Sequence, residues 1–159
     1  MVKTGIGQDS HRFEPDGSTK PLKLGGAIIP GCPGLAGNSD ADVILHALCN
    51  AISSITTVPI LGAVTDKMCM EQGITDSVEY VKVALATLKG YSISHIAVTI
   101  EAKRPHLAAH IKTIRQSIAD IVKVSIDNVG CTATSGEGLT AFGRGEGVAV
   151  FVAMTVEKC

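Results

Sequence analysis

The stretch that most constrains the fold is Val148-Ala149-Val150-Phe151-Val152-Ala153-Met154, near the end of the chain. It predicts a strand over residues 148–156, yet apolar side chains occupy both sets of alternating positions. A strand of this kind is buried on both faces of its sheet. Helices of the same chain can cover one face, and we expect a partner subunit to cover the other. The positive mean hydropathy likewise favours an oligomer.

The rest of the chain predicts more strands and three amphipathic helices. The predicted strands are residues 2–9, 92–102 and 128–134, with a hairpin that turns at Gly25-Gly26. The predicted helices run from Ser39-Asp40-Ala41-Asp42 to Ile55, from Asp76 to Gly90 and from Pro105 to Lys123. Residues 61–75 have no clear period and suggest a mobile flap. We therefore expect one α/β (α+β) domain over residues 1–159, with one mixed sheet covered on one face by helices.

Composition excludes several functional classes. The net charge is −1 and no Lys/Arg run exceeds two residues, which argues against a nucleic-acid or membrane footprint. No signal-peptide core and no apolar run of about 18 residues is present, so a cytoplasmic location is expected. The five cysteines show no CxxC spacing, which argues against a disulfide framework and a thiolate zinc site.

Asp9-Ser10-His11 ends the first apolar run and is the main candidate for chemistry. In a strand, Asp9 and His11 share one face because side chains alternate. His46 lies on the polar stripe of the first helix, opposite its aliphatic stripe. One carboxylate and two imidazoles suit a zinc ion with an open fourth position, and Asp42 and Asn50 are candidates to orient His46. The open alternative is a surface turn beside an ordinary helix histidine.

Two glycine-rich stretches lead to different conclusions. Gly5-Ile6-Gly7 lacks the third glycine of a dinucleotide fingerprint, and the chain contains no P-loop motif. The loop from Thr134 to Gly147 packs five glycines around hydroxyl groups, two glutamates and an arginine. Such a loop allows close approach of its backbone to a phosphate, although a long hairpin turn has the same composition.

Three motifs together resemble one known family. They are Asp9-Ser10-His11, then Asn38-Ser39-Asp40-Ala41-Asp42 followed by His46, and Thr134-Ser135-Gly136-Glu137 leading to Phe142-Gly143-Arg144-Gly145-Glu146-Gly147. In order and spacing the chain resembles the 2-C-methyl-D-erythritol 2,4-cyclodiphosphate synthase family of the non-mevalonate isoprenoid pathway, nearly end to end.

The resemblance implies an assembly and two metal ions. It implies a homotrimer with sheets packed around a threefold axis and active sites between adjacent subunits. The implied zinc ligands are Asp9, His11 and His46. A second divalent ion, Mg²⁺ or Mn²⁺, would be held at the diphosphate by Glu137.

The resemblance also implies a substrate site. Asn38 and Ser135, together with Glu137, are implied catalytic residues. The implied substrate-binding residues are Asp9, His11, Asn38, Ser39, Ile60, Leu61, Gly62, Ala102, Lys103, Arg104, Pro105, His106, Leu107, Ala108, Ala133, Thr134, Ser135, Glu137 and Arg144. Arg144 and Glu146 match positions near the trimer axis, where some members bind isoprenoid diphosphates.

The activity implied is that of a divalent-metal-dependent phosphorus–oxygen lyase. The 2-phosphate of 4-diphosphocytidyl-2-C-methyl-D-erythritol 2-phosphate attacks the β-phosphorus of its own diphosphate and expels CMP. Three positions depart from the family pattern: Asn38 stands at a usual His, Ile60 at a usual Asp, and His106 at a usual Lys. These departures concern substrate affinity, because the three implied zinc ligands and Glu137 are retained.

Two other functions stay open from the sequence. The loss of Asp at position 60, with Arg144 and Glu146 retained, suits a metal-containing trimer that mainly binds isoprenoid diphosphates. A zinc-dependent phosphoesterase that uses bound water as its nucleophile is the second alternative.

Overall fold

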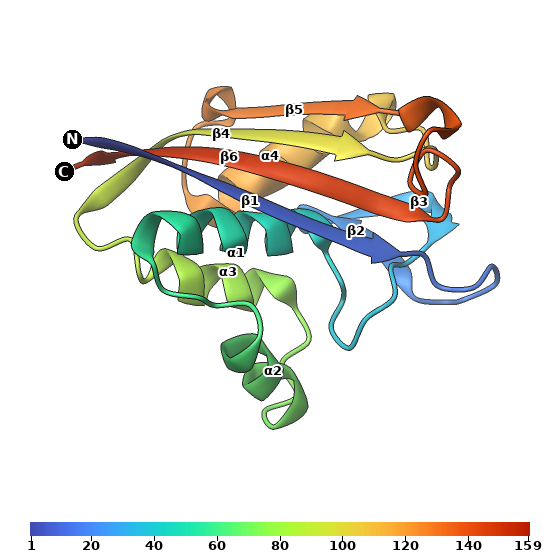
Figure 1. Cartoon of the computed structure of the whole chain (residues 1–159), viewed down its shortest axis with the longest axis horizontal. Coiled ribbons are helices and arrows are strands. Elements are labelled where there is room, and N and C mark those ends of the chain that lie inside the picture. Colours follow the sequence, from blue (N-terminus) through green and yellow to red (C-terminus); the bar gives the residue numbers. More distant parts are fainter.

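A four-stranded mixed sheet forms the body of the protein (Figure 1), in a computed structural model that describes all residues from 1 to 159. The strand order is β1 (Val2–Arg12), β6 (Gly147–Lys158), β4 (Tyr91–Glu101) and β5 (Val129–Thr134). β6 runs antiparallel to both β1 and β4, whereas β4 and β5 are parallel. The strand predicted from its two apolar faces is therefore a central one, and the mixed sheet is confirmed.

A separate hairpin lies beside this sheet. It pairs β2 (Pro21–Leu24) with β3 (Ala27–Pro33) around Gly25-Gly26. Both glycines have positive φ, +64° and +84°, as a two-residue primed turn requires. The predicted hairpin is thus confirmed at its predicted turn.

The helices cover one face of the sheet, as expected. α1 (Val43–Thr56) packs on β1 and β6, and α4 (Ile111–Val122) packs on β5. α3 (Ser77–Leu85) packs on α1, and α2 (Ala63–Met70) projects beyond α3 in Figure 1. The short 3₁₀ turns are η1 (Ala108–His110), η2 (Ile126–Asn128) and η3 (Gly136–Gly138). No helix is long and apolar enough to cross a membrane.

The predicted helix boundaries were wrong in three places. The first helix starts at Val43, because Ala41 has a φ of +54° and Asp42, rather than Ser39, caps the helix by accepting from the Leu45 amide. The helix after Asp76 ends at Leu85, before Gly90. The helix expected from Pro105 starts at Ile111, since the preceding residues bury Leu107 in an irregular stretch and then form η1.

The segment 61–75 contains a helix that the sequence did not predict. α2 buries only Thr65, so its sequence carries no apolar stripe from which a helical period is read. Its N-terminus is closed by Thr65, whose hydroxyl accepts from the Gly62 amide. This local hydrogen bond was not visible in the hydrophobic pattern.

The two faces of β6 differ in their burial. Val148, Val150, Val152 and Met154 face the helices and are fully buried. On the other face, Phe151 is 47% exposed and Ile6 of neighbouring β1 is 65% exposed. The expectation that both faces are buried therefore holds fully for only one face within this chain: on the second face Ala149 is buried, whereas Phe151 is left uncovered.

Candidate functional site

Two strand glycines bring α1 close to β1. A Cβ atom at Gly7 would lie 1.9 Å from the Ala47 carbonyl oxygen, and one at Gly5 would lie 2.3 Å from that of Ala51. Real Cβ atoms do not approach so closely, so only glycine lets the helix backbone rest on the strand. Gly5-Ile6-Gly7, rejected as a nucleotide motif, thus acts in packing and sets the distance between His46 and the strand.

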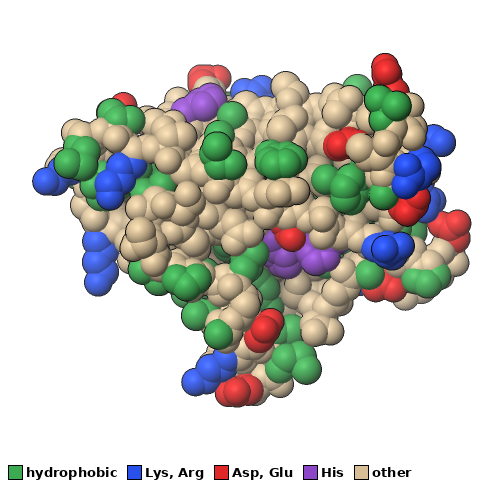
Figure 2. Space-filling model, viewed as in Figure 1, with side chains coloured by type: hydrophobic (Ala, Val, Ile, Leu, Met, Phe, Trp, Pro, Cys, Tyr) green, Lys and Arg blue, Asp and Glu red, His purple; other side chains and the backbone are tan.

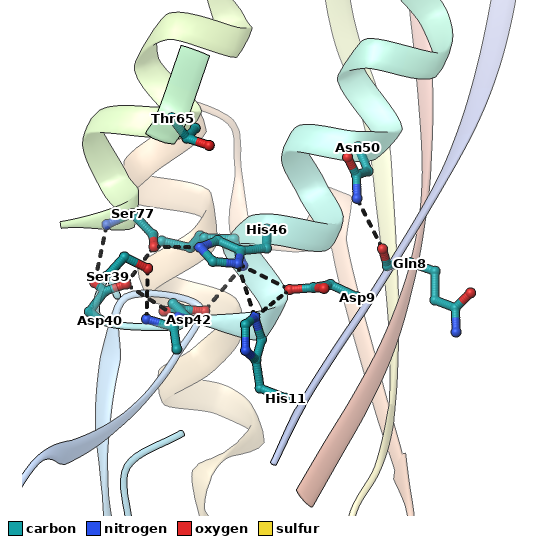
Figure 3. A network of polar contacts seen from close by, with 12 residues as sticks. Gln8, Asp9, His11, Ser39, Asp40, Asp42, His46, Asn50, Thr65 and Ser77 are labelled. Atoms are coloured by element: carbon teal, nitrogen blue, oxygen red, sulfur yellow. Dashed lines mark hydrogen bonds and ion pairs between the residues drawn. The ribbon is translucent and has the colours of Figure 1, made fainter. Parts of the chain in front are cut away.

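Asp9, His11 and His46 converge at this contact (Figure 3). Asp9 Oδ2 lies 2.8 Å from His11 Nε2 and 3.0 Å from His46 Nδ1, and the two imidazole nitrogens are 3.2 Å apart. His46 is 9% exposed and the other two side chains are partly buried. The structure therefore brings together the three residues expected to ligate a metal, from β1 and α1. Figure 2 shows purple histidine surface beside an acidic group in a hollow above the projecting lobe.

Hydrogen bonds on the far side of each ring decide what the near side offers. His11 Nδ1 lies 2.9 Å from the Ala36 carbonyl oxygen, which can only accept, so Nδ1 carries the proton. His46 Nε2 lies 3.0 Å from Ser77 Oγ. The Ser77 hydroxyl donates its hydrogen bond to Asp40, so the Ser77 oxygen accepts the hydrogen bond from His46 Nε2. The neutral rings therefore direct two lone pairs at the Asp9 carboxylate, an arrangement that a shared cation stabilises.

The pKa values of Asp9 and His11 are shifted by burial and by their mutual contacts. Burial raises the pKa of Asp9, but in the metal-free protein hydrogen bonds from His11 and His46, which donate toward Asp9 when their rings are protonated, outweigh burial and lower that pKa to about 2. The hydrogen bond to Asp9 raises the pKa of His11, although burial acts in the opposite direction. The donor set of one carboxylate and two imidazoles fits zinc with a free coordination position.

Neither residue predicted to orient His46 does so. Asp42 is fully buried and accepts from the amides of Gly25 at 2.9 Å, Gly26 at 2.6 Å and Leu45 at 3.1 Å. Burial raises the pKa of Asp42, and these backbone donors act against it. Asn50 donates to the Gln8 carbonyl oxygen at 3.0 Å. The prediction from the helical stripe shared with His46 was wrong, because Ser77 of α3 contacts the His46 ring instead.

A cavity of about 150 Å³ opens next to the triad. Two of the candidate metal ligands line it together with the predicted Asn38 and Ser39; the complete lining is His11, Gly37, Asn38, Ser39, His46, Thr65, Asp66, Cys69 and Tyr80. Sequence reasoning missed the contribution of α2 and α3, since α2 itself was not predicted. Ile60, Leu61 and Gly62 do not line this cavity, and Ile60 is buried in the core at 3% exposure.

A second cavity, of about 320 Å³, is lined by most of the residues 102–108 and 133–135 that were predicted to bind substrate. It lies where the parallel strands β4 and β5 end, a common ligand position in open sheets. Its lining is Ala102, Lys103, Pro105, His106, Leu107, Ala108, Ile111, Ala133, Thr134 and Ser135. Arg104 does not line it, because its guanidinium lies over the Phe13 ring and bonds to Asp16 and to the Gly145 carbonyl oxygen.

The glycine-rich loop keeps Glu137 apart from the triad. Glu137 lies in η3 with a φ of +50° and is exposed, and its amide donates to Ser135 Oγ at 3.3 Å. It does not belong to the cluster of side chains that could hold a metal ion. Arg144 pairs with Glu146 at 3.0 Å, and both side chains are largely exposed. Within one chain, Glu137 and the Asp9–His11–His46 cluster are therefore separate.

The largest cavity lies elsewhere. Its volume is about 670 Å³, and it opens between α3 and α4. It contains none of the residues predicted for catalysis, substrate binding or metal ligation. Volume alone is therefore a poor guide to the site in this protein.

Known proteins resemble this chain over nearly its full length. The model of the YgbB family matches residues 2–157. Proteins named 2-C-methyl-D-erythritol 2,4-cyclodiphosphate synthase match it at 52% identity over 157 residues in Chlamydia muridarum, and at 50% over 161 residues in Chlamydia trachomatis serovar D. The first alignment covers 98% of this chain and 88% of that protein, and the second covers 100% and 90%.

Solved structures agree with the fold. The bifunctional IspDF of Campylobacter jejuni matches with a TM-score of 0.89 at 28% identity, over 100% of this chain and 43% of that one. The CDP complex of IspF from Plasmodium falciparum matches with a TM-score of 0.85, over 99% of this chain and 96% of that one. At 20% identity, the second match supports the fold alone.

Proposed function

The chain belongs to the YgbB family, and from this membership we propose that it converts 4-diphosphocytidyl-2-C-methyl-D-erythritol 2-phosphate to 2-C-methyl-D-erythritol 2,4-cyclodiphosphate and releases CMP. The observation that carries the proposal is the 52% identity to a synthase of that name across nearly the whole chain. The Asp9–His11–His46 cluster supports it independently, since the fold brings His46 of α1 to Asp9 and His11 of β1.

Asp9, His11 and His46 are the residues that would hold zinc. A zinc ion bound there supplies a Lewis acid for a phosphoryl oxygen. Asn38 and Ser39 line the adjoining cavity and can donate neutral hydrogen bonds to a phosphate. We assign the second divalent ion, Mg²⁺ or Mn²⁺, to Glu137 on the opposite part of the site.

The reaction demands positioning more than covalent help. A phosphate oxygen of the substrate forms a bond to the β-phosphorus, while the bond from that phosphorus to the oxygen of the leaving CMP breaks. The nucleophile is already an anion, so no general base is required. Holding both groups in line within one molecule supplies much of the rate, and Asn38 and Ser135 stabilise charge on the phosphoryl oxygens. The enzyme is accordingly a metal-dependent phosphorus–oxygen lyase.

The cavity at the ends of β4 and β5 is assigned to the cytidine part. Its lining offers apolar contacts from Ala102, Leu107 and Ala108, and polar groups from Lys103, Thr134 and Ser135. A cavity with mostly apolar walls and a few polar groups suits a nucleoside. Arg104 contributes by holding the glycine-rich loop at Gly145 rather than by facing this cavity.

We propose a homotrimer with active sites between subunits. The outer sheet face supports it, because Ile6 and Phe151 form apolar surface that this chain leaves uncovered. The separation of the triad from Glu137 also supports it, since a neighbouring subunit can complete each site. Sedimentation is expected to give three times the 16.4 kDa chain mass, and a single-chain mass would exclude the assembly.

A cytoplasmic location is proposed from cysteine chemistry. All five cysteines are free, including the exposed Cys159, as is usual in reducing compartments. Arg144 and Glu146 are retained as the proposed contact for an isoprenoid diphosphate on the trimer axis. A protein that only binds such diphosphates gains no support from the comparisons.

The decisive experiment is an assay of the purified protein with the cytidylyl substrate, Zn²⁺ and Mg²⁺. CMP and the cyclic diphosphate are expected in equal amounts, measured by ³¹P NMR and chromatography. CMP with an open-chain product would indicate hydrolysis, and no CMP at all would overturn the proposed activity. Chelator-treated protein, tested before and after metal is restored, provides the control for metal dependence.

A further inference from the structure

The ring of His46 is held at both of its nitrogens (Figure 3). Nδ1 faces Asp9 and His11, while Nε2 contacts Ser77, which in turn contacts Asp40. We propose that Ser77, fixed by Asp40, is the positioning residue that sets the orientation and tautomer of His46 for metal binding. The inference rests on the metal centre of the proposed function and deepens it.

The direction of the hydrogen bonds follows from the chemistry of Asp40. A carboxylate can only accept hydrogen bonds. Asp40 Oδ1 accepts from the Ser77 hydroxyl group, and Asp40 Oδ2 accepts from the Ser77 amide at 3.1 Å. Lys23 pairs with the same Oδ2 at 3.4 Å. With its only proton committed to Asp40, the Ser77 oxygen must accept from His46 Nε2. The proton of the neutral ring is therefore held on Nε2.

This assignment determines what His46 presents to a metal. With the proton on Nε2, the lone pair lies on Nδ1 and points at the Asp9 and His11 donors. The opposite tautomer would place an N–H group where the ion must bind. Metal-ligating histidines usually have their second nitrogen bound to a carboxylate or carbonyl group, and here a serine transmits the effect of the carboxylate.

The surroundings make Ser77 a rigid partner. It is fully buried as the first residue of α3, which packs on α1, the helix that carries His46. The Asp40 amide also donates to the Thr75 carbonyl oxygen at 2.9 Å, so the loop before α1 and the start of α3 are joined. The buried carboxylate of Asp42 is already satisfied by three backbone amides, which leaves Ser77 as the side-chain partner of Nε2.

The first test is the zinc dissociation constant of Ser77→Ala, measured by competition with a chromogenic chelator. Loss of an outer hydrogen-bond partner is expected to weaken zinc binding about 10- to 100-fold. Ser53→Ala is the matched control, because it also removes a buried serine hydroxyl from this domain, one that has no hydrogen-bond partner. Equal zinc affinity in the two variants would overturn the proposal.

The second test separates positioning from a merely structural role. In the Co²⁺-loaded protein, Ser77→Ala is expected to shift the visible absorption bands, because the His46 ring reorients. Thermal unfolding by circular dichroism accompanies every variant. An unchanged Co²⁺ spectrum with only a lower melting temperature would assign Ser77 to stability and defeat the inference.

Asp40→Asn provides a variant that keeps Ser77. An asparagine amide can donate to Ser77 Oγ and so reverse the relay, which would favour the unsuitable His46 tautomer. Zinc binding is therefore expected to weaken about tenfold or more, even if Ser77→Ala fails to fold. Wild-type affinity in Asp40→Asn would contradict the relay. Because substrate is absent, these results stand apart from cyclisation, and a wild type that binds no zinc would overturn the metal centre itself.

Discussion

The two halves of the proposed active site differ in how completely one chain builds them. In the Asp9–His11–His46 triad, the outer nitrogen of each ring is held by a hydrogen bond, to the Ala36 carbonyl oxygen or to Ser77, and the triad lies against packed backbone. Glu137 is exposed on a loop and has no contact with the triad. We expect the preorganised half to bind a metal before substrate arrives, and the exposed half to need substrate or a neighbouring subunit to complete it.

The largest expected effect comes from removing a ligand of the organised half. His46→Ala should abolish stoichiometric zinc binding and lower cyclisation by about 10³-fold, since a Lewis acid contributes several kcal/mol. Metal content by mass spectrometry and CMP release measure the two effects. Zinc at the wild-type level in this variant would remove His46 from the metal centre.

Next in size is the packing that brings the two elements of the triad together. Gly7→Ala should lower the free energy of unfolding by about 3 kcal/mol, because its Cβ would collide with the Ala47 carbonyl oxygen. Gly130→Ala is the matched control: it also lies in a strand, its nearest neighbour is 3.7 Å away, and little change is expected. Urea unfolding of both variants shows whether the destabilisation comes from the close approach of α1 to β1 or from the loss of a strand glycine as such.

A smaller effect is expected on the free energy of unfolding at acidic pH. The folded pKa of Asp9 is lowered from 3.8 to about 2, so its contribution is present above 3.8 and is lost as the pH falls towards 2. That contribution is about 2 kcal/mol for the metal-free protein. Urea unfolding of wild type and Asp9→Asn across this pH range measures it. The same pH dependence in both proteins would show that Asp9 is not its source.

The smallest effect tests the exposed half. Glu137→Gln keeps the shape of the side chain but removes its charge, and should raise the Mg²⁺ concentration for half-maximal activity about tenfold. Zinc content should stay at the wild-type level, because Glu137 lies outside the triad. Lower zinc content would contradict the division into two halves, and unchanged Mg²⁺ dependence would remove Glu137 as the second metal ligand.

Local patterns in the sequence predicted much of the architecture. The turn at Gly25-Gly26, the central apolar strand and the Asp76 cap depend on neighbouring residues, and all three are seen in the structure. α2 escaped prediction because it buries only Thr65 and so has no apolar stripe. Arg104 was assigned to the substrate by its motif, but its contacts with Phe13, Asp16 and Gly145 are long-range and have no signature in the sequence.

The sequence by itself determined the chemical groups of the candidate metal site. Asp9 and His11 share one strand face because side chains alternate, and His46 was predicted to join them from the first helix. Only the tertiary structure decided how that site is organised. It showed that Gly5 and Gly7 set the approach of α1, that Ser77 rather than Asp42 or Asn50 holds His46, and that Glu137 stands apart. The physical reason is that local periodicity records which way a side chain points, whereas hydrogen-bond partners across elements depend on how those elements pack.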